Sequence, residues 1–292
     1  MKTTFPEKAK KFFTSWEFVL LLILFAEIVI FATKNPKFLM PRVLFGSLND
    51  IISICIISLF VTFVMITGGI DIQAGSIVGL SSIVLGVAWQ DGGMNIWAAV
   101  ALAVVVAGVC GALSGYFVAY CGVQPMVVTL GGSFLFTGVA LLVSNLSATE
   151  SYKGISGFPD SFLQISKFKL FGVIPCQVII FLVLAVIAYV LLNKTKYGRM
   201  VFLIGVNKDA AEFSGINTRL ITMTTYILSG ISAAIAGIIL TSYIGTAKSD
   251  IGVTFTLPII TAVVLGGTLS TGGKGSVVGT ALAAVVIGVL KF

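Results

Sequence analysis

The chain has 292 residues, of which 58% are hydrophobic and only 10% are charged, and its formal net charge is +7. Soluble domains usually contain about a quarter charged residues, so this composition excludes a soluble protein and predicts an integral protein of the lipid bilayer. The basic excess is modest and spread over loops, which favours anchoring on the cytoplasmic side and argues against nucleic acid as a partner. Histidine is absent, so the commonest metal ligand and proton shuttle is missing, and we predict no metal site.

Apolar runs long enough to cross a bilayer, which takes about 20 mostly apolar residues, follow one another along the chain. Each is apolar throughout instead of alternating, which excludes the strands of a membrane barrel. We therefore predict an all-α fold, a polytopic helical transmembrane bundle in which residues 1–292 form a single transmembrane domain. The nine runs are Glu17–Thr33, Ile51–Thr67, Ile72–Trp89, Ile96–Cys121, Met126–Leu146, Val173–Leu192, Leu220–Ile244, Val253–Ser270 and Ser276–Leu290.

The distribution of basic residues predicts which loops face the cytoplasm. The amino-terminal tail, residues 1–16, contains four lysines and one glutamate, and we place it on the cytoplasmic side. Alternating the spans then puts residues 194–219 inside and puts Lys34–Asp50 and Ala148–Gly172 outside. An odd number of spans leaves the carboxyl end outside, so we expect one further C-terminal span to be missing after Phe292.

Small residues recur at spacings that let helix backbones approach closely, and ordinary bundle packing is the simplest interpretation. The cysteines fall in or beside apolar runs without close pairs, and we interpret them as small buried hydrophobes. The small-residue sets are Gly75 with Gly79, Gly111 with Gly115, Gly275 with Gly279, and Ser229 with Ala233 and Gly237; the cysteines are Cys55, Cys110, Cys121 and Cys176.

Clustered glycines interrupt the apolar runs in two places, residues 67–75 and 266–275. Unwound backbone within a membrane is tolerated only where protein buries it or water lines it, so both segments are candidate walls of a transport path. The candidate path residues are Gly69, Asp71, Gln73, Gly266 and Gly267. Asp71 could instead cap a helix at the cytoplasmic edge, and Glu27, within the first run, is interpreted as an acceptor between helices.

Catalytic patterns are missing from the sequence. The nearest approach to a phosphate-binding loop ends at Gly273 and Lys274, but Thr268 stands where the first glycine belongs and Gly275 where the hydroxyl residue belongs. We therefore predict that the chain is not an enzyme and holds no cofactor.

Residues 194–219 contain a short helix that is indicated by its capping residues. Asn207 can accept from the first turn, Asp209 is favourable at a helix start, and Gly215 can supply a left-handed stop. A helix of about seven residues is unstable alone. Its apolar side, formed by Ala210, Ala211, Phe213 and Ile216, suits docking against another protein, which predicts that this segment receives force from a separate subunit.

Four ordered motifs resemble the permease subunits of bacterial sugar ABC importers of the ribose type, and the resemblance runs through nearly the whole chain. They are residues 205–216 (GVNKDAAEFSGI), residues 69–71 (GID) followed by Gly75, residues 128–131 (VTLG), and residues 262–267 (AVVLGG) followed by Gly272, Gly273, Gly275 and Ser276. The first motif is the one by which such permeases contact their ATPase. The residues implied in ATPase coupling are Gly205, Asn207, Asp209, Ala210, Ala211, Glu212, Ser214 and Gly215.

The resemblance also implies the partners and the cargo. An ATP-binding subunit, a second and different permease, and a periplasmic binding protein would complete an importer in the bacterial inner membrane. Within the family, residues 152–159, 201–205 and 249–252 are most similar to permeases of autoinducer-2 importers, which implies that cargo and a role in quorum sensing. Ribose or another monosaccharide is the alternative cargo. An ion-coupled transporter and a purely structural membrane subunit are the alternatives from other classes.

Overall fold

The computed structural model describes residues 16–35, 38, 40–149, 153–170 and 172–290. The predicted cytoplasmic tail therefore lies outside the described residues, except for Trp16. Tyr152, the first residue of the stretch 152–159 that resembles autoinducer-2 permeases, and the last residues, Lys291 and Phe292, also lie outside them.

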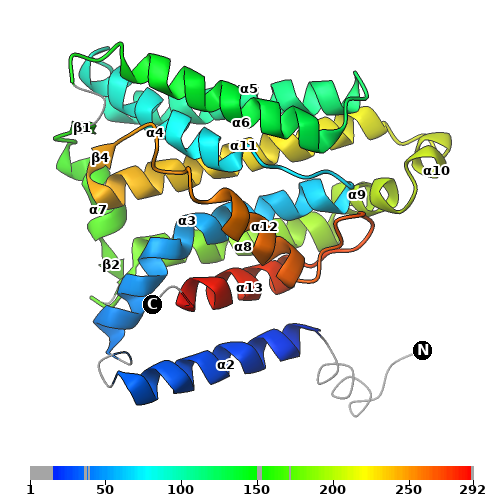
Figure 1. The fold of residues 1–292 in the computed structure, drawn as a ribbon, viewed down its shortest axis with the longest axis horizontal. Helices are drawn as coiled ribbons and strands as arrows, with labels where there is room; N and C mark the ends of the chain where they lie inside the picture. Colours follow the sequence, from blue (N-terminus) through cyan, green and yellow to red (C-terminus); the bar gives the residue numbers. More distant parts are fainter. Residues whose placement is uncertain (1–15, 36–37, 39, 150–152, 171, 291–292) are drawn as a thin grey trace.

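Each of the nine predicted runs coincides with a helix among the described residues, and the predicted all-α membrane bundle is confirmed. The helices lie roughly along one direction, with their loops gathered at two ends of the molecule (Figure 1). They are α2 (Trp16–Lys34), α3 (Pro41–Ile66), α4 (Ala74–Gln90), α5 (Ile96–Ala119), α6 (Pro125–Ser144), α8 (Cys176–Lys194), α11 (Thr218–Ile244), α12 (Thr256–Leu265) and α13 (Val277–Val289).

The remaining elements lie at the two ends of the bundle. At one end are α7 (Asp160–Lys167) and four two-residue strands, and at the other are α9 (Lys196–Val206) and α10 (Lys208–Phe213) (Figure 1). Strand β1 (Ile155–Ser156) pairs antiparallel with β4 (Thr246–Ala247), and β2 (Lys169–Leu170) with β3 (Ile174–Pro175). The end with α7 is the outer end in the predicted topology.

Three boundaries differ from the prediction. Helix α3 begins at Pro41, so much of the predicted outside loop Lys34–Asp50 is helical, because a proline at the first position is compatible with a helix start. Helix α9 was not predicted, since residues 196–206 are short of the length needed to cross a bilayer. Helix α12 has only 10 residues, about 15 Å, which is half the thickness of a bilayer core.

Helices α3 and α11 run in opposite directions, and each is followed by a non-helical stretch and then by a helix that begins inside the bundle; after α11 the stretch includes β4 (Figure 1). After α3 the chain runs as extended backbone from the inner end into the middle of the bundle, where α4 begins. After α11 the chain runs from the outer end into the middle, where α12 begins. This is an inverted arrangement, which many transporters use to build a path near the middle of the bilayer.

The two interrupted stretches meet through glycine. A side chain at Gly79 would meet the carbonyl oxygen of Ser249, and one at Gly75 would meet the carbonyl oxygen of Gly252. The Thr256 hydroxyl donates to the Ile72 carbonyl at 3.1 Å. Helix α4 therefore lies directly against the turns that precede α12, residues 249–254, which confirms the prediction of close packing at the first glycine pair.

Helix α11 lies at the centre of the bundle, where it packs against α3, α4 and α5, whereas α2 lies at the edge against α13. The close contact with α5 again depends on glycine, because side chains at Gly111 and Gly230 would meet the carbonyl oxygens of Tyr226 and Ala107. Cys55 and Cys110 are buried, as predicted, but Cys121 is exposed and Cys176 half-buried. The prediction is wrong for Cys121 because the residue follows the end of α5 at a bundle end.

The glycine contact between α4 and residues 249–252 predicts that one added methyl group has a large effect on stability. We expect Gly79→Ala to lower the free energy of unfolding by about 1–3 kcal/mol, because a Cβ there must displace backbone rather than a flexible side chain. Gly138→Ala on α6 is the matched control, since its Cβ would meet nothing within 4 Å. The measurement is the thermal unfolding of both variants in detergent, and equal stability of the two would contradict the close approach.

Candidate functional site

The first candidate site is the segment implied in ATPase coupling, residues 205–216 at the inner end, which is called the coupling segment below. Helix α10 forms there as the capping residues predict. The Asn207 side-chain oxygen accepts from the Ala210 amide at 2.9 Å, and Gly215 has a left-handed φ of +81°. Helix α10 has six residues and packs against α9 and the start of α11. A helix this short depends on that packing for its stability.

The predicted coupling residues divide into an exposed set and an inward set. The exposed set is Asn207, Asp209, Ala210, Glu212, Ser214 and Gly215. Ala211 is only 4% exposed, so the expectation that its side chain lies on the docking face is wrong: the methyl group faces the chain's own helices and anchors α10. Phe213, by contrast, is 93% exposed. With Asp209 and Glu212 it lines a pocket of about 440 Å³. An exposed aromatic ring beside two carboxylates suits a partner protein.

Gly205, at the end of α9, lies at a junction of three chain segments. A side chain at Gly205 would meet the Ile66 carbonyl at the end of α3 and the amide of Gly273 in the loop after α12. The Gly273 amide donates to that same Ile66 carbonyl at 2.9 Å. The coupling segment thus touches, backbone to backbone, the chain that leads into α4 and the chain that follows α12.

The second candidate site is a polar cluster around the extended segment 69–73. The Asp71 carboxylate, only 1% exposed, accepts from the Ser229 hydroxyl on α11 at 2.6 Å and from the Gln73 amide at 3.1 Å. These two bonds hold the charged group in an apolar bundle, where an unpaired charge would be strongly unfavourable. Asp71 thus bonds the backbone just before α4, but Gln73 and not Asp71 is the N-cap residue, so the helix-cap interpretation is not confirmed. The position is buried, and the bond to α11 was not predicted.

Further hydroxyl groups surround the same segment. The Ser114 hydroxyl on α5 donates to the Gln73 side-chain oxygen at 2.7 Å, and the Thr129 hydroxyl on α6 donates to the Ile70 carbonyl at 2.9 Å. Gly69 is buried, and a side chain there would meet the Tyr226 hydroxyl on α11. Three helices therefore converge on residues 69–73. Ser114, Tyr226 and Ser229 were missed because a single hydroxyl in an apolar helix is too common to mark a site.

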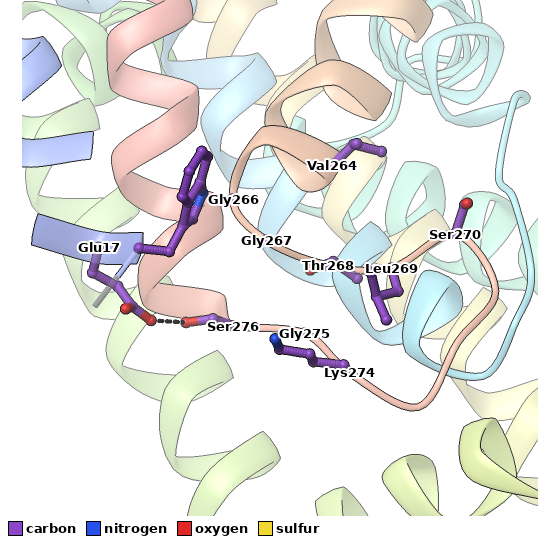
Figure 2. A pocket seen from close by; sticks show the side chains of 11 residues that line it. Glu17, Val264, Gly266, Gly267, Thr268, Leu269, Ser270, Lys274, Gly275 and Ser276 are labelled. Carbon is purple, nitrogen blue, oxygen red and sulfur yellow. Dashed lines mark hydrogen bonds between the residues drawn. The ribbon is translucent and has the colours of Figure 1, made fainter. Parts of the chain in front are cut away.

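Gly266 and Gly267 lie apart from this cluster. They line a pocket of about 680 Å³ at the inner end, together with Glu17 and Lys274 (Figure 2). The Trp16 indole donates to the Leu265 carbonyl at 2.6 Å, and the Ser276 hydroxyl donates to the Glu17 carboxylate at 3.1 Å. The five predicted path residues thus fall into two groups that the structure does not bring together. Whether either group contacts cargo stays a prediction.

Glu27, the other buried carboxyl group, lies on α2 and is 7% exposed. Its Oε2 atom has no hydrogen-bond partner among the described residues, so a role as an acceptor between helices is not supported for that oxygen. No group of three or more histidine, cysteine, aspartate or glutamate side chains that could hold a metal ion occurs in the part of the chain that the structure describes.

The Asp71 cluster generates a prediction about stability. We expect Ser229→Ala to lower the free energy of unfolding by about 2 kcal/mol, because it leaves a buried carboxylate oxygen without its donor. Ser232→Ala is the matched control on the same helix, since the Ser232 hydroxyl bonds only to a carbonyl of its own helix. Thermal unfolding of both variants in detergent tests this, and an equal loss in the two would show that the bond to Asp71 contributes nothing of its own.

The comparisons with known proteins agree with this architecture. The family model described as branched-chain amino acid transport system, permease component, matches residues 43–292. The autoinducer 2 import system permease protein LsrD of Photorhabdus laumondii is 42% identical over 276 residues, which cover 94% of this chain and 82% of that protein. The protein of the same name from Salmonella typhimurium is 42% identical over 277 residues, 95% of this chain and 83% of that protein. No solved structure matches. The chain therefore belongs to this family of ABC-importer permeases, and it is a transport subunit of the membrane and not an enzyme.

Proposed function

We propose that the chain is one of two different permease subunits of an importer for autoinducer-2 in a bacterial inner membrane. The observation that carries the proposal is the 42% identity to permeases named for that cargo over 94% of the chain. The cargo is a small neutral molecule with several hydroxyl groups. The site supports this chemistry, because Asp71 and Glu27 are the only buried charged side chains among the described residues, whereas hydroxyl groups are plentiful.

The partners follow from the same family membership. A periplasmic binding protein delivers the cargo to the outer end, a second permease completes the path, and an ATP-binding subunit docks at the inner end. Helix α10 supports the docking role, since it exposes Phe213 while Ala211 anchors it from behind. Closure of the ATPase moves α10, and the junction at Gly205 passes that movement to the interrupted stretches.

The direct test is uptake by cells that lack their own autoinducer-2 importer but express this chain with the three other components. We expect autoinducer-2 to disappear from the medium at a rate that falls to background without this chain. Uptake of labelled ribose by the same cells, with no uptake of autoinducer-2, would identify a monosaccharide as the cargo. Uptake that persists when ATP is depleted, and stops with an uncoupler, would favour the ion-coupled alternative.

Phe213 provides a test of ATPase docking. We expect Phe213→Asp to weaken binding of the ATP-binding subunit by about 30-fold and to abolish uptake, because exposed aromatic rings that fill a partner's pocket dominate interface energies. The matched control is Phe168→Asp, which changes the same residue type at the outer end, where the ring is 53% exposed. Co-purification of the ATP-binding subunit with each variant is the measurement. Normal co-purification of the Phe213 variant would place the docking surface elsewhere.

The proposed orientation, with the amino terminus in the cytoplasm, predicts which native cysteine is reachable from each side. Cys121 follows α5 at the inner end, and Cys176 begins α8 at the outer end. In a Cys176→Ser background we expect a membrane-impermeant maleimide to label Cys121 after lysis of spheroplasts but not before. Cys121→Ser in the same background is the control for labelling of the buried thiols. Labelling of Cys121 in intact spheroplasts would show that the chain has the opposite orientation.

A further inference from the structure

Two hydrogen-bonding groups beside the extended segment 69–73 have no partner. The Tyr226 hydroxyl and the side-chain nitrogen of Gln73 form no hydrogen bond among the residues that the structure describes, although both side chains are 0% exposed. Both belong to groups that can donate a hydrogen bond. A buried donor without an acceptor destabilises the structure that contains it, so native proteins keep few of them. Two unpartnered buried donors around one segment therefore require an explanation.

The groups flank the same five residues. Tyr226 lies on α11 with its hydroxyl against Gly69, and Ser229, three residues further along α11, bonds to Asp71. Gln73 ends the segment, and Ser114 fixes its side-chain oxygen. The side-chain nitrogen of Gln73 is thereby directed away from its one partner. The groups along the segment from Ile70 to Gln73 mostly accept hydrogen bonds from neighbouring hydroxyl groups, and two donors are left without an acceptor.

The segment between them, residues 69–73, forms no helix, so a displacement of it would break no run of helical hydrogen bonds. The segment begins three residues after Ile66, the residue that Gly205 and Gly273 contact at the inner end. Tyr226 itself is held in place, because its backbone lies against Gly111 of α5. Movement of the coupling segment would therefore shift residues 69–73 past a stationary tyrosine.

We infer that Tyr226 and Gln73 are specificity-determining residues of the transport path: their free donors bond to the hydroxyl groups of a small polyhydroxylated cargo when the segment between them moves aside. The inference rests on the proposed function and adds the groups that recognise the cargo. In the structure both donors are shut away from solvent and unpaired. A site built to bond hydroxyl groups rejects analogues that lack them, because the site's own polar groups then stay unpaired.

The test is Tyr226→Phe in the complete importer, because the inference requires opposite effects on stability and on transport. Removing an unpartnered buried hydroxyl is expected to raise the melting temperature of the purified chain in detergent. The same change is expected to raise the KM for uptake of autoinducer-2 by about three- to tenfold, the effect of one lost hydrogen bond. Tyr197→Phe is the control for stability, because the Tyr197 hydroxyl pairs with Thr224 at 3.0 Å, and its loss is expected to lower the melting temperature.

Gln73 supplies an independent variant. The double change Gln73→Met with Ser114→Ala removes both members of one hydrogen bond together, so folding is expected to be preserved. The KM of this variant is expected to rise by a similar factor, and combining it with Tyr226→Phe is expected to raise the KM further.

A wild-type KM in the Tyr226→Phe importer overturns the inference, as does a lower melting temperature of that variant, which would indicate a bonded hydroxyl such as one holding a buried water. Failure of the inference about Tyr226 can be distinguished from failure of the proposed function. If the wild-type importer takes up ribose instead of autoinducer-2, the proposed cargo is wrong, and the same KM comparison with ribose still decides the role of Tyr226. If the cargo carries no hydroxyl groups, both proposals fail.

Discussion

The structure depends on one contact, the direct approach of helix α4 to the turns that precede α12, residues 249–254. Gly75 and Gly79 make it possible, because any side chain there would strike the backbone of residues 249–252. Both partners are interrupted spans, and interrupted backbone in a membrane must find hydrogen bonds outside its own helix. Hydroxyl groups of neighbouring elements supply them: Thr129 serves the Ile70 carbonyl and Thr256 the Ile72 carbonyl.

This contact brings the starts of two helices of opposite direction, the 17-residue α4 and the 10-residue α12, to the middle of the bundle, and the unwound stretches before them lead to opposite ends. The inner end of one stretch begins at Ile66, and the loop after α12 is bonded to it through Gly273. Gly205 closes the junction, so a displacement of α9 acts on both stretches at once. Helix α10, an exposed helix of six residues, packs against α9 and α11. Through Gly205 of α9 it is connected to both interrupted stretches.

Local chemistry made part of this predictable from the sequence. Continuous apolarity located nine apolar helices among the described residues, five of them long enough to cross a membrane, and the caps Asn207 and Gly215 located α10, because both signals are contained in a few neighbouring residues. The ten-residue length of α12 was not predictable, since the apolar run from Val253 to Ser270 continues past both ends of the helix. Nor was the inward direction of Ala211, which depends on how α10 packs against α9 and α11. The partners of Asp71 lie 158 residues away or on the unwound backbone itself, beyond any local pattern.

The same packing separates the parts of the bundle that can move from those that cannot. Helices α5 and α11 touch backbone to backbone at Gly111 and Gly230, so a relative shift would drive carbonyl oxygens into Cα atoms. The polar residues of α11 are thus fixed in position, whereas the segment 69–73 is held mainly by hydroxyl side chains that can exchange partners. A path opened by displacing this segment would have the hydroxyl groups of α11 on a rigid wall and the Asp71 and Gln73 side chains on the displaced segment. Such a path is suited to a neutral cargo rich in hydroxyl groups, because it offers several hydrogen-bonding groups and one carboxylate that already accepts two hydrogen bonds.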